Sequence, residues 1–458
     1  MWRERAEHFL WGAATSAYQI EGAPLADGAG PSIWHAFAHT PGRIRHGDTG
    51  DRACEHYRRW ADDLALMAEL GLGAYRFSVS WARVLPTGRA PVNAAGLDFY
   101  RRLVDGLLAR GIVPMLTLYH WDLPLALHER GGWLHPDSPA WFADYAAVLF
   151  RALDDRVTHW LTFNEPWVSA VLGYLEGSRA PGWRDPSAAA RVGHHLLLAH
   201  AAATAAYRAL GRHAIGIALN LEPQHPARDT AADRAAAARR DAFVNRWFLE
   251  PLTQGRYPAE LPAWFGPAWP DSAPAALEAL RGSCDFLGVN YYTRALVRDV
   301  SKEVTDLGNT ARLIAAARVA VRAGTQMGWE VYPAGLTEIL LRLKTDYGNP
   351  PVYVTENGAA FADPPPAGGV VADPQRIAYL RAHLTALAAA VDQGADVRGY
   401  FVWSLFDNFE WAEGYTPRFG LFQIDPVTGA RIPKASAHWY RAWMRAAGRA
   451  GCDALPRD

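Results

Sequence analysis

Eight short apolar segments alternate with longer helix-compatible segments, and this alternation limits the fold more than any other feature of the sequence. The apolar segments are rich in β-branched and aromatic residues and are predicted strands: 9–17, 74–80, 113–119, 160–163, 215–220, 286–291, 352–355 and 399–403. Predicted helices lie between them at 60–70, 95–110, 139–153, 188–210, 336–346 and 374–393. Without a dinucleotide-binding fingerprint, this pattern favours a closed parallel barrel over an open doubly wound sheet. The predicted fold class is α/β, a single (β/α)₈ TIM barrel with extended βα loops.

The length of 458 residues would allow about three domains, but one barrel with insertions can exceed 400 residues. No change in composition marks a boundary, so we expect one barrel domain over residues 1–458. Long βα loops are predicted at 22–31 and 362–369, and a rim insertion at 295–325. The charged, Ala/Arg-rich segment 230–240 is interpreted as a solvated helix face without a function.

Composition and charge limit the classes of ligand and partner that this chain can be expected to bind. Half of the residues are hydrophobic and the formal net charge is −1, which gives no electrostatic reason to expect nucleic acid or an anionic membrane as a partner. Cys54, Cys284 and Cys452 lie far apart, which argues against a disulfide framework or a thiolate zinc site. The first residues lack the apolar core of a signal peptide, and no run is long and apolar enough to span a bilayer. We therefore expect a cytoplasmic protein with a small neutral ligand, and a homo-oligomer remains open.

Two glutamates stand where predicted strands end. The segment Thr-Phe-Asn-Glu-Pro at 162–166 ends the fourth strand, and Val-Thr-Glu-Asn-Gly at 354–358 ends the seventh. The carboxyl ends of barrel strands meet at one mouth, so Glu165 and Glu356 should face each other there. Either one alone could be an ordinary solvated carboxylate. Their joint occurrence favours an acid/base pair.

The other strand ends supply hydrogen-bonding groups and flat aromatic faces that suit a polyhydroxylated ring. They are Gln19, Arg76, His120, Asn290, Tyr291, Tyr292 and Trp403. Five tryptophans flanked by polar residues are predicted to lie in the pocket rather than in the core: Trp121, Trp167, Trp329, Trp403 and Trp411.

Neither a metal nor a cofactor is predicted. His120 is interpreted as a hydrogen-bonding partner of the ligand, because no convincing metal spacing surrounds it. His35 and His39 are four residues apart, but the sequence offers no further ligand beside them.

Several motifs follow one another in the order of a known family. They are Phe-Leu-Trp-Gly-Ala-Ala-Thr-Ser-Ala-Tyr-Gln-Ile-Glu-Gly at 9–22, Tyr-Arg-Phe-Ser at 75–78, Tyr-His-Trp-Asp at 119–122, Thr-Phe-Asn-Glu-Pro-Trp at 162–167, Asn-Tyr-Tyr-Thr at 290–293, Thr-Glu-Asn-Gly at 355–358 and Trp-Ser-Leu-Phe-Asp-Asn-Phe-Glu-Trp at 403–411. In these motifs the sequence resembles the family-1 β-glycosidases, and the resemblance covers nearly the whole chain.

The resemblance implies a (β/α)₈ barrel with Glu165 as acid/base and Glu356 as nucleophile. It implies that the sugar hydroxyls are held by Gln19, His120, Asn164, Glu410 and Trp411, above a platform formed by Trp403. Arg76, Asn290 and Tyr292 would support the nucleophile. Trp121, Trp167, Trp329 and Phe419 would complete the substrate pocket, the tryptophans Trp167 and Trp329 on the leaving-group side.

The retaining mechanism explains why two glutamates are needed. Carboxyl groups about 5–5.5 Å apart divide the work of a nucleophile and an acid. We expect Arg76 and the Tyr292 hydroxyl to keep the pKa of Glu356 low. Partial burial beside Trp167 and the charge of Glu356 should raise the pKa of Glu165.

The expected activity is that of an exo-acting β-glucosidase on small neutral β-glucosides or cello-oligosaccharides, with β-galactosidase or β-fucosidase side activity. One alternative is a 6-phospho-β-glycosidase, but a carboxylate at Glu410 would repel the phosphate. Another is a sugar-binding module without catalysis, which would not need both Glu165 and Glu356. Aglycone preference should depend on loops such as 170–193 and 295–325.

Overall fold

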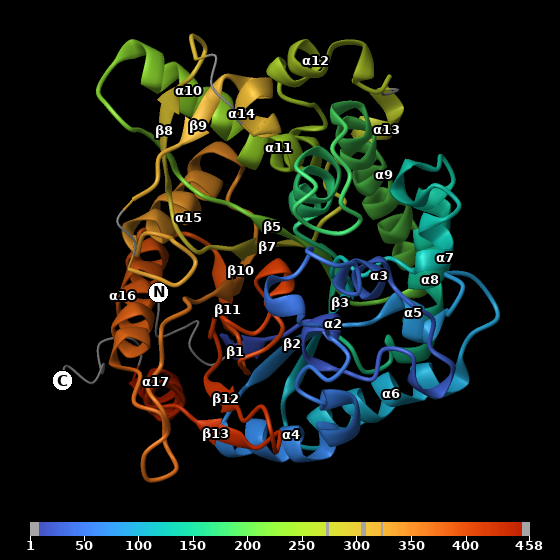
Figure 1. The fold of residues 1–458 in the computed structure, drawn as a ribbon, viewed down its shortest axis with the longest axis vertical. Coiled ribbons are helices and arrows are strands. Elements are labelled where there is room, and N and C mark those ends of the chain that lie inside the picture. The colour runs from blue at the N-terminus through green and yellow to red at the C-terminus, as the bar shows by residue number, and fades with distance from the viewer. Residues whose placement is uncertain (1–8, 272–273, 304–307, 322–323, 451–458) are drawn as a thin grey trace.

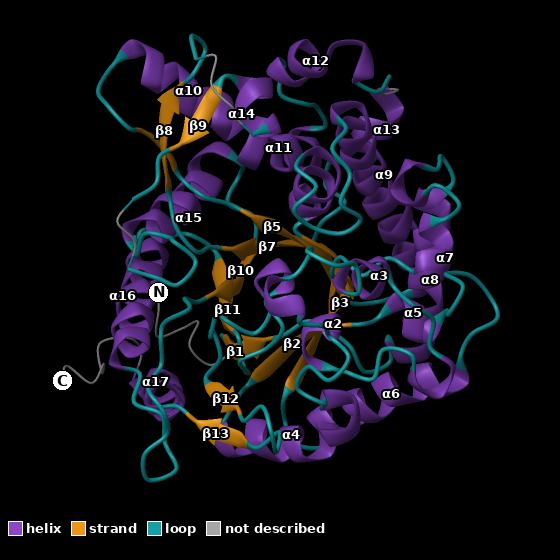
Figure 2. Ribbon diagram, in the orientation of Figure 1, coloured by secondary structure: helices purple, strands orange, loops and turns teal. Residues whose placement is uncertain are grey.

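A closed barrel of eight parallel strands forms the centre of the protein (Figure 2). The computed structural model describes residues 9–271, 274–303, 308–321 and 324–450. Around the barrel the strands follow the order β1-β11-β10-β7-β5-β4-β3-β2. Their bounds are β1 (Leu10–Ala14), β2 (Ala74–Ser78), β3 (Val113–Tyr119), β4 (His159–Asn164), β5 (Ala214–Asn220), β7 (Phe286–Asn290), β10 (Val352–Asn357) and β11 (Val397–Trp403). The predicted fold class is confirmed.

Each predicted strand corresponds to one barrel strand, although the first was predicted too long. The chain leaves β1 after Ala14 and enters a short helix, α2 (Ala17–Ile20). The backbone N–H of Ala17 donates to the Ser78 hydroxyl at 2.8 Å, which ties this turn to the end of β2. The strand pattern therefore continues past the point where the backbone turns.

Helices surround the barrel (Figure 1). The main ones are α4 (His56–Leu70), α6 (Ala94–Leu108), α8 (Ser138–Leu153), α9 (Pro186–Leu210), α15 (Ala334–Asp346), α16 (Pro374–Asp392) and α17 (Ala435–Ala450). In α6 the buried residues Leu97, Tyr100, Val104 and Leu107 recur at helical spacing and form the face that packs inward. Helix α9 starts where the Asp185 side chain accepts from the N–H of Ser187, with proline in its first turn.

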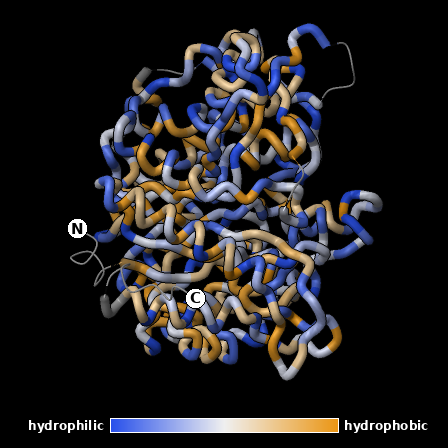
Figure 3. Tube along the Cα trace, turned by 90° about the vertical axis from the view of Figure 1, so that its left-hand side faces the viewer, coloured by the Kyte–Doolittle hydropathy of each residue, from blue (hydrophilic) through white to orange (hydrophobic). Residues whose placement is uncertain are grey.

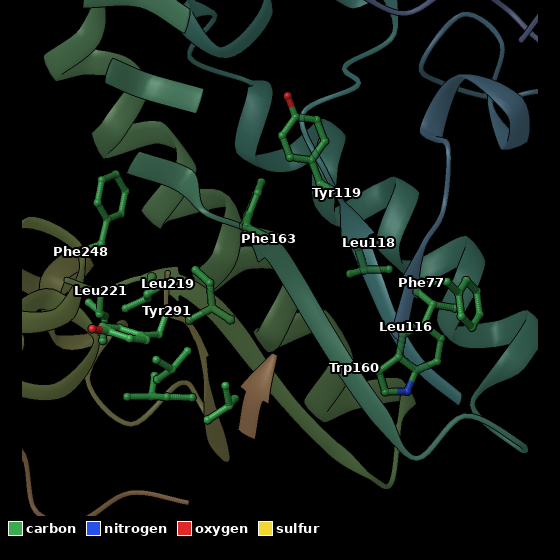
Figure 4. Packing of buried hydrophobic residues seen from close by; sticks show 14 of the residues in the cluster. Phe77, Leu116, Leu118, Tyr119, Trp160, Phe163, Leu219, Leu221, Phe248 and Tyr291 are labelled. Carbon is green, nitrogen blue, oxygen red and sulfur yellow. The ribbon is translucent and has the colours of Figure 1, made fainter. Parts of the chain in front are cut away.

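Two layers of apolar side chains hold the strands in place. Outward-facing residues such as Leu116, Trp160 and Phe163 pack beneath the helices (Figure 4). A second cluster fills the barrel interior and includes Met115, Leu161 and Phe401. Gly12 makes room for the Phe401 ring, because a Cβ there would lie 2.6 Å from it. Each fully buried large apolar side chain stabilises the fold by about 1.5–3 kcal/mol.

An insertion lies next to the β5 and β7 side of the barrel, at the top of Figure 1. It contains a small sheet of β6 (Gln224–Pro226), β8 (Ala295–Asp299) and β9 (Ala316–Arg318), against which α10 (Ala231–Asp241) packs. Helices α11 (Trp247–Gln254), α12 (Glu260–Phe265), α13 (Pro274–Glu278) and α14 (Asn309–Ile314) lie nearby. The rim insertion predicted at 295–325 is present, although 304–307 and 322–323 lie outside the described residues.

Shorter elements complete the chain: α3 (Ile33–Ala38), α5 (Trp81–Val84), α7 (Leu125–His128), β12 (Phe422–Ile424) and β13 (Arg431–Pro433). No helix within the described part of the chain has both the length and the apolar character that crossing a membrane requires. The hydropathy along the trace in Figure 3 alternates over short stretches, in agreement with this finding.

Candidate active site

Glu165 and Glu356 both lie at the carboxyl ends of barrel strands. Glu356 is the second-last residue of β10, and Glu165 directly follows β4. Glu165 has a φ of 46°, a left-handed conformation that costs a non-glycine residue about 1–3 kcal/mol. Its backbone N–H donates to the carbonyl of Ala218 in β5 at 2.9 Å, which fixes the turn. The structure therefore brings both predicted glutamates to the same mouth.

The Glu356 carboxyl group is buried and has a strong donor on each oxygen. Arg76 Nη1 donates to Oε1 at 2.6 Å, and the Tyr292 hydroxyl donates to Oε2 at 2.6 Å. Arg76 is itself fully buried, and its Nη2 donates to Asn164 Oδ1 at 2.6 Å. The guanidinium of Arg76, from the middle of β2, thus links the ends of β4 and β10.

Glu165 has a weaker set of partners. Its Oε1 accepts a hydrogen bond of 2.8 Å from the amide of Asn290, which also donates to Asn164 Oδ1 at 2.9 Å. The Asn290 side-chain oxygen accepts from the Thr355 hydroxyl at 2.7 Å, so the orientation of the amide is fixed. Glu165 therefore receives a neutral donor where Glu356 receives a cation.

The two carboxyl groups differ in how readily they ionise. Burial raises the pKa of Glu165 to about 8, and the negative charge of Glu356 adds to this effect. Burial also raises the pKa of Glu356, against the opposing effects of Arg76 and Tyr292. The expectation of a low pKa at Glu356 is thus wrong in direction, because desolvation outweighs the donors. The donors still differ: the Arg76 cation favours the ionised form of Glu356 more than the neutral Asn290 amide favours that of Glu165.

The imidazole ring of His120 is buried and offers a hydrogen-bond donor. Its Nε2 lies 3.0 Å from the Asn164 side-chain nitrogen, which can only donate, so Nε2 accepts and Nδ1 carries the proton. Burial and the charge of Arg76 hold the pKa of His120 well below its usual value, so the ring is neutral. Its Nδ1 is buried and has no hydrogen-bond partner among the described residues.

Glu410 is a third carboxyl group that lines the cavity, together with Glu165. Its Oε2 is buried without a hydrogen-bond partner in the described part of the chain. Burial raises the pKa of Glu410 to about 8, while the Arg179 guanidinium lowers it. The Gln19 amide donates to Asn408 Oδ1 at 3.0 Å and to the Phe409 carbonyl at 2.9 Å, which holds the loop that carries Glu410.

Aromatic rings enclose the space between these groups. Trp121 and Trp411 have ring centroids 4.6 Å apart, and Trp329 and Tyr292 are 5.2 Å apart. Trp403 and Phe419 are buried and belong to one apolar cluster that Tyr292 and Trp329 join. Of the five tryptophans predicted in the pocket, four line the cavity, and Trp403 lies in the cluster beneath it.

The cavity has a volume of about 290 Å³. Glu165, Asn290, Tyr292 and Glu410 reach it together with the four tryptophans. Polar residues that were not predicted also line it: Arg179, Asn220, Glu222, Arg240, Thr293 and Arg318. Arg179 comes from the 170–193 segment, which the sequence had marked as an aglycone loop.

The interpretation of 230–240 as a solvated face is wrong at Arg240. This residue lies at the carboxyl-terminal end of α10 and donates to Glu222 Oε1 at 2.7 Å, while Arg318 Nη1 lies 3.6 Å from Glu222 Oε2. The three residues are far apart in sequence. They meet at the cavity only in the folded chain, so no local pattern could have indicated the cluster.

Comparison with known proteins agrees with this geometry. The model of glycosyl hydrolase family 1 matches residues 3–449. The chain belongs to glycosyl hydrolase family 1. It is 47% identical over 443 residues to β-glucosidase A of Thermotoga maritima, across 95% of this chain and 96% of that protein. It is 46% identical over 436 residues to a 1,4-β-D-glucan glucohydrolase of Thermotoga neapolitana, across 95% and 96% of the two chains.

Solved structures of family 1 share the fold. A family 1 β-glucosidase from Thermotoga maritima superposes with a TM-score of 0.92 at 46% identity, covering 96% of this chain and 97% of that one. The β-glucosidase from Thermotoga maritima in complex with castanospermine gives 0.91 at 45% identity, covering 96% and 98%. The resemblance seen in the sequence motifs is confirmed, and this glycosyl hydrolase family 1 member is an enzyme.

Proposed function

We propose that the chain, as one catalytic domain over residues 1–458, is a retaining exo-β-glucosidase that removes terminal β-D-glucosyl residues by double displacement. One observation carries this proposal. Glu356 is paired with a buried arginine and a tyrosine hydroxyl, whereas Glu165 has only an amide donor. Of two carboxyl groups in one mouth, one is therefore suited to attack as an anion and the other to donate a proton.

In the first step, Glu356 attacks the anomeric carbon and the glycosidic bond breaks. Glu165 gives its proton to the leaving oxygen, so the aglycone departs as a neutral alcohol. The product is a covalent ester between Glu356 and the sugar. Arg76 and Tyr292 hold the Glu356 carboxylate in position through both of its oxygens.

In the second step, the ester removes the negative charge at Glu356. The pKa of Glu165 then falls, because that charge was one cause of its high value. Glu165 takes a proton from water, the water attacks the anomeric carbon, and Glu356 leaves as a carboxylate. Glu165 thus regains a proton from water, in place of the one that left with the aglycone.

The sugar would be held by groups that lack protein partners. His120 Nδ1 offers a donor and Glu410 Oε2 an acceptor, both buried. Asn164 holds the His120 ring, and Gln19 holds the loop that carries Glu410. Trp411 would close the pocket beside these two residues. Trp403 and Phe419 would form the apolar floor, and Trp121 would lie beside Trp411. Trp167 and Trp329 would contact the leaving group.

We propose small neutral β-glucosides or cello-oligosaccharides as substrates, with side activity on β-galactosides and β-fucosides. The names β-glucosidase A and 1,4-β-D-glucan glucohydrolase of the relatives support this class. The free oxygen of Glu410 supports it too, because sugar hydroxyls that donate to it favour its charged form, whereas a phosphate with a charge of about −1.5 to −2 at neutral pH would be repelled by that form.

A panel of p-nitrophenyl β-glycosides, free and 6-phosphorylated, tests the substrate class through kcat/KM. We expect the β-glucoside to be hydrolysed with the highest value, the galactoside and fucoside with lower values, and the 6-phosphoglucoside the slowest. A preference for the phosphorylated sugar would contradict the proposed class, and turnover of none of them would contradict the proposed activity.

A further inference from the structure

Three potential metal ligands converge at a place away from the proposed catalytic groups. His35 belongs to α3, His39 follows that helix as its C-cap, and Asp51 comes from the loop beyond. One ligand atom from each side chain lies within 4.8 Å of the others. In the part of the chain that the structure describes, no other three histidine, cysteine or acidic side chains converge in this way.

The orientations of both imidazoles are suited to an ion. His39 Nδ1 lies 2.7 Å from the carbonyl oxygen of His35, so this nitrogen carries a proton and donates it. That bond directs Nε2 toward Asp51 Oδ2 at 3.0 Å. A carbonyl that fixes the tautomer of a histidine in this way is the usual support of a metal ligand.

His35 contributes a nitrogen that the fold leaves unused. Its Nδ1 is buried and makes no hydrogen bond within the described residues, and it points toward Asp51 Oδ1 at 3.6 Å. A plain ion pair between His39 and Asp51 would not need this second imidazole. The two rings lie side by side, with centroids 4.3 Å apart, and Asp51 is near both.

We propose that His35, His39 and Asp51 form a site for one divalent ion of the zinc class. Two imidazole nitrogens and a carboxylate oxygen suit Zn²⁺, Co²⁺ or Ni²⁺ and are a poor match for Ca²⁺ or Mg²⁺, which prefer oxygen ligands only. Since 41% of the His39 side chain and 48% of the Asp51 side chain are exposed, water can fill the remaining positions. The sequence shows the spacing of His35 and His39 but no further ligand beside them; Asp51, twelve residues beyond His39, supplies that ligand.

One ring contact links the site to the sugar pocket. Trp34 directly precedes His35, and its ring packs against Trp411 at 4.5 Å between centroids. An ion bound to all three ligands would tie the loop at Asp51 to α3. It would therefore stabilise the segment that supports Trp411, without touching Glu165 or Glu356.

Equilibrium competition for ZnCl₂ between untagged protein and a chromophoric chelator tests the proposal. We expect one Zn²⁺ per chain, and an affinity lower by about tenfold or more in His35→Ala, His39→Ala and Asp51→Asn. The matched control is His135→Ala, which removes a histidine from an exposed pair with Asp137 at 3.9 Å that has only two ligands. This variant should bind Zn²⁺ as the wild type does.

A second measurement keeps the test valid if one variant folds poorly. CoCl₂ should give visible d–d absorption bands with the wild type and with His135→Ala, and these bands should be lost in the three ligand variants. ZnCl₂ should also raise the thermal midpoint of the wild type more than that of His39→Ala. Equal Zn²⁺ affinity of the wild type and His39→Ala, or cobalt bands that survive in all three ligand variants, would overturn the proposal.

Discussion

Arg76 Nη1 donates a hydrogen bond of 2.6 Å to Glu356 Oε1, from the middle of β2 to the end of β10. The two residues are 280 positions apart and both are buried. A cation at this place offsets part of the cost of desolvating the carboxylate. The fold therefore determines which of the two glutamates is the better anion.

Arg76→Lys should lower kcat/KM on β-glucosides by about ten- to a hundredfold, because a charged hydrogen bond contributes about 1.5–3 kcal/mol. Lysine keeps the charge but cannot bind Glu356 and Asn164 at once as the guanidinium does. The pKa of Glu356 should rise, so the acidic limb of the kcat/KM profile should move to higher pH. A pH series on p-nitrophenyl β-glucoside measures both effects.

Arg83→Lys is the matched control for this prediction. Arg83 is also buried and pairs with a carboxylate, Glu21, at 2.9 Å, but its hydrogen bonds go to Glu21 and to backbone carbonyls rather than to Glu356. Its replacement should change the thermal midpoint and leave the acidic limb in place. If Arg76→Lys shifts only the thermal midpoint, the role assigned to Arg76 is structural.

Glu165→Gln should slow substrates according to their leaving groups. Aryl glucosides with poor leaving groups should suffer far more than a dinitrophenyl glucoside, whose departure needs no proton. Since the pKa of Glu165 is raised to about 8, wild-type kcat/KM should fall above that pH as the acid loses its proton. The variant should lack this basic limb. Equal slowing of all substrates would count against an acid role.

Glu410→Ser should reduce kcat/KM on glucosides by about ten- to a hundredfold, from the loss of hydrogen bonds between the buried carboxylate and the sugar. Xylosides lack the 6-hydroxymethyl group and should be affected less. Glu413→Ser is the control, because Glu413 is a nearby carboxylate with 40% of its side chain exposed. The assigned pocket would be refuted by a Glu410→Ser variant that hydrolyses glucosides as fast as Glu413→Ser does.

The barrel and the two glutamates could be predicted because both depend on local patterns. Each buried parallel strand is a short apolar run, and Glu165 and Glu356 follow directly where two such runs end. The end of β1 was missed because the apolar run continues into a turn that Ser78 holds from another strand.

The remaining features depend on contacts between distant segments. Glu222, Arg240 and Arg318 meet only once the insertion has packed against the barrel. Asp51 joins His35 and His39 only through the loop after α3. The pKa of Glu356 depends on how deeply the carboxyl is buried, and residue types alone do not reveal the balance between desolvation and the Arg76 charge.

The central claim is that Glu356 attacks the anomeric carbon, and rescue of Glu356→Gly by azide tests it most directly. The variant should not hydrolyse p-nitrophenyl β-glucoside, because the attacking carboxylate is absent. Azide can fill the vacated space and attack from the same face, so the predicted product is α-glucosyl azide, identified by NMR. Recovery of the β-azide, or full hydrolysis without azide, would contradict the assignment of Glu356 as the nucleophile.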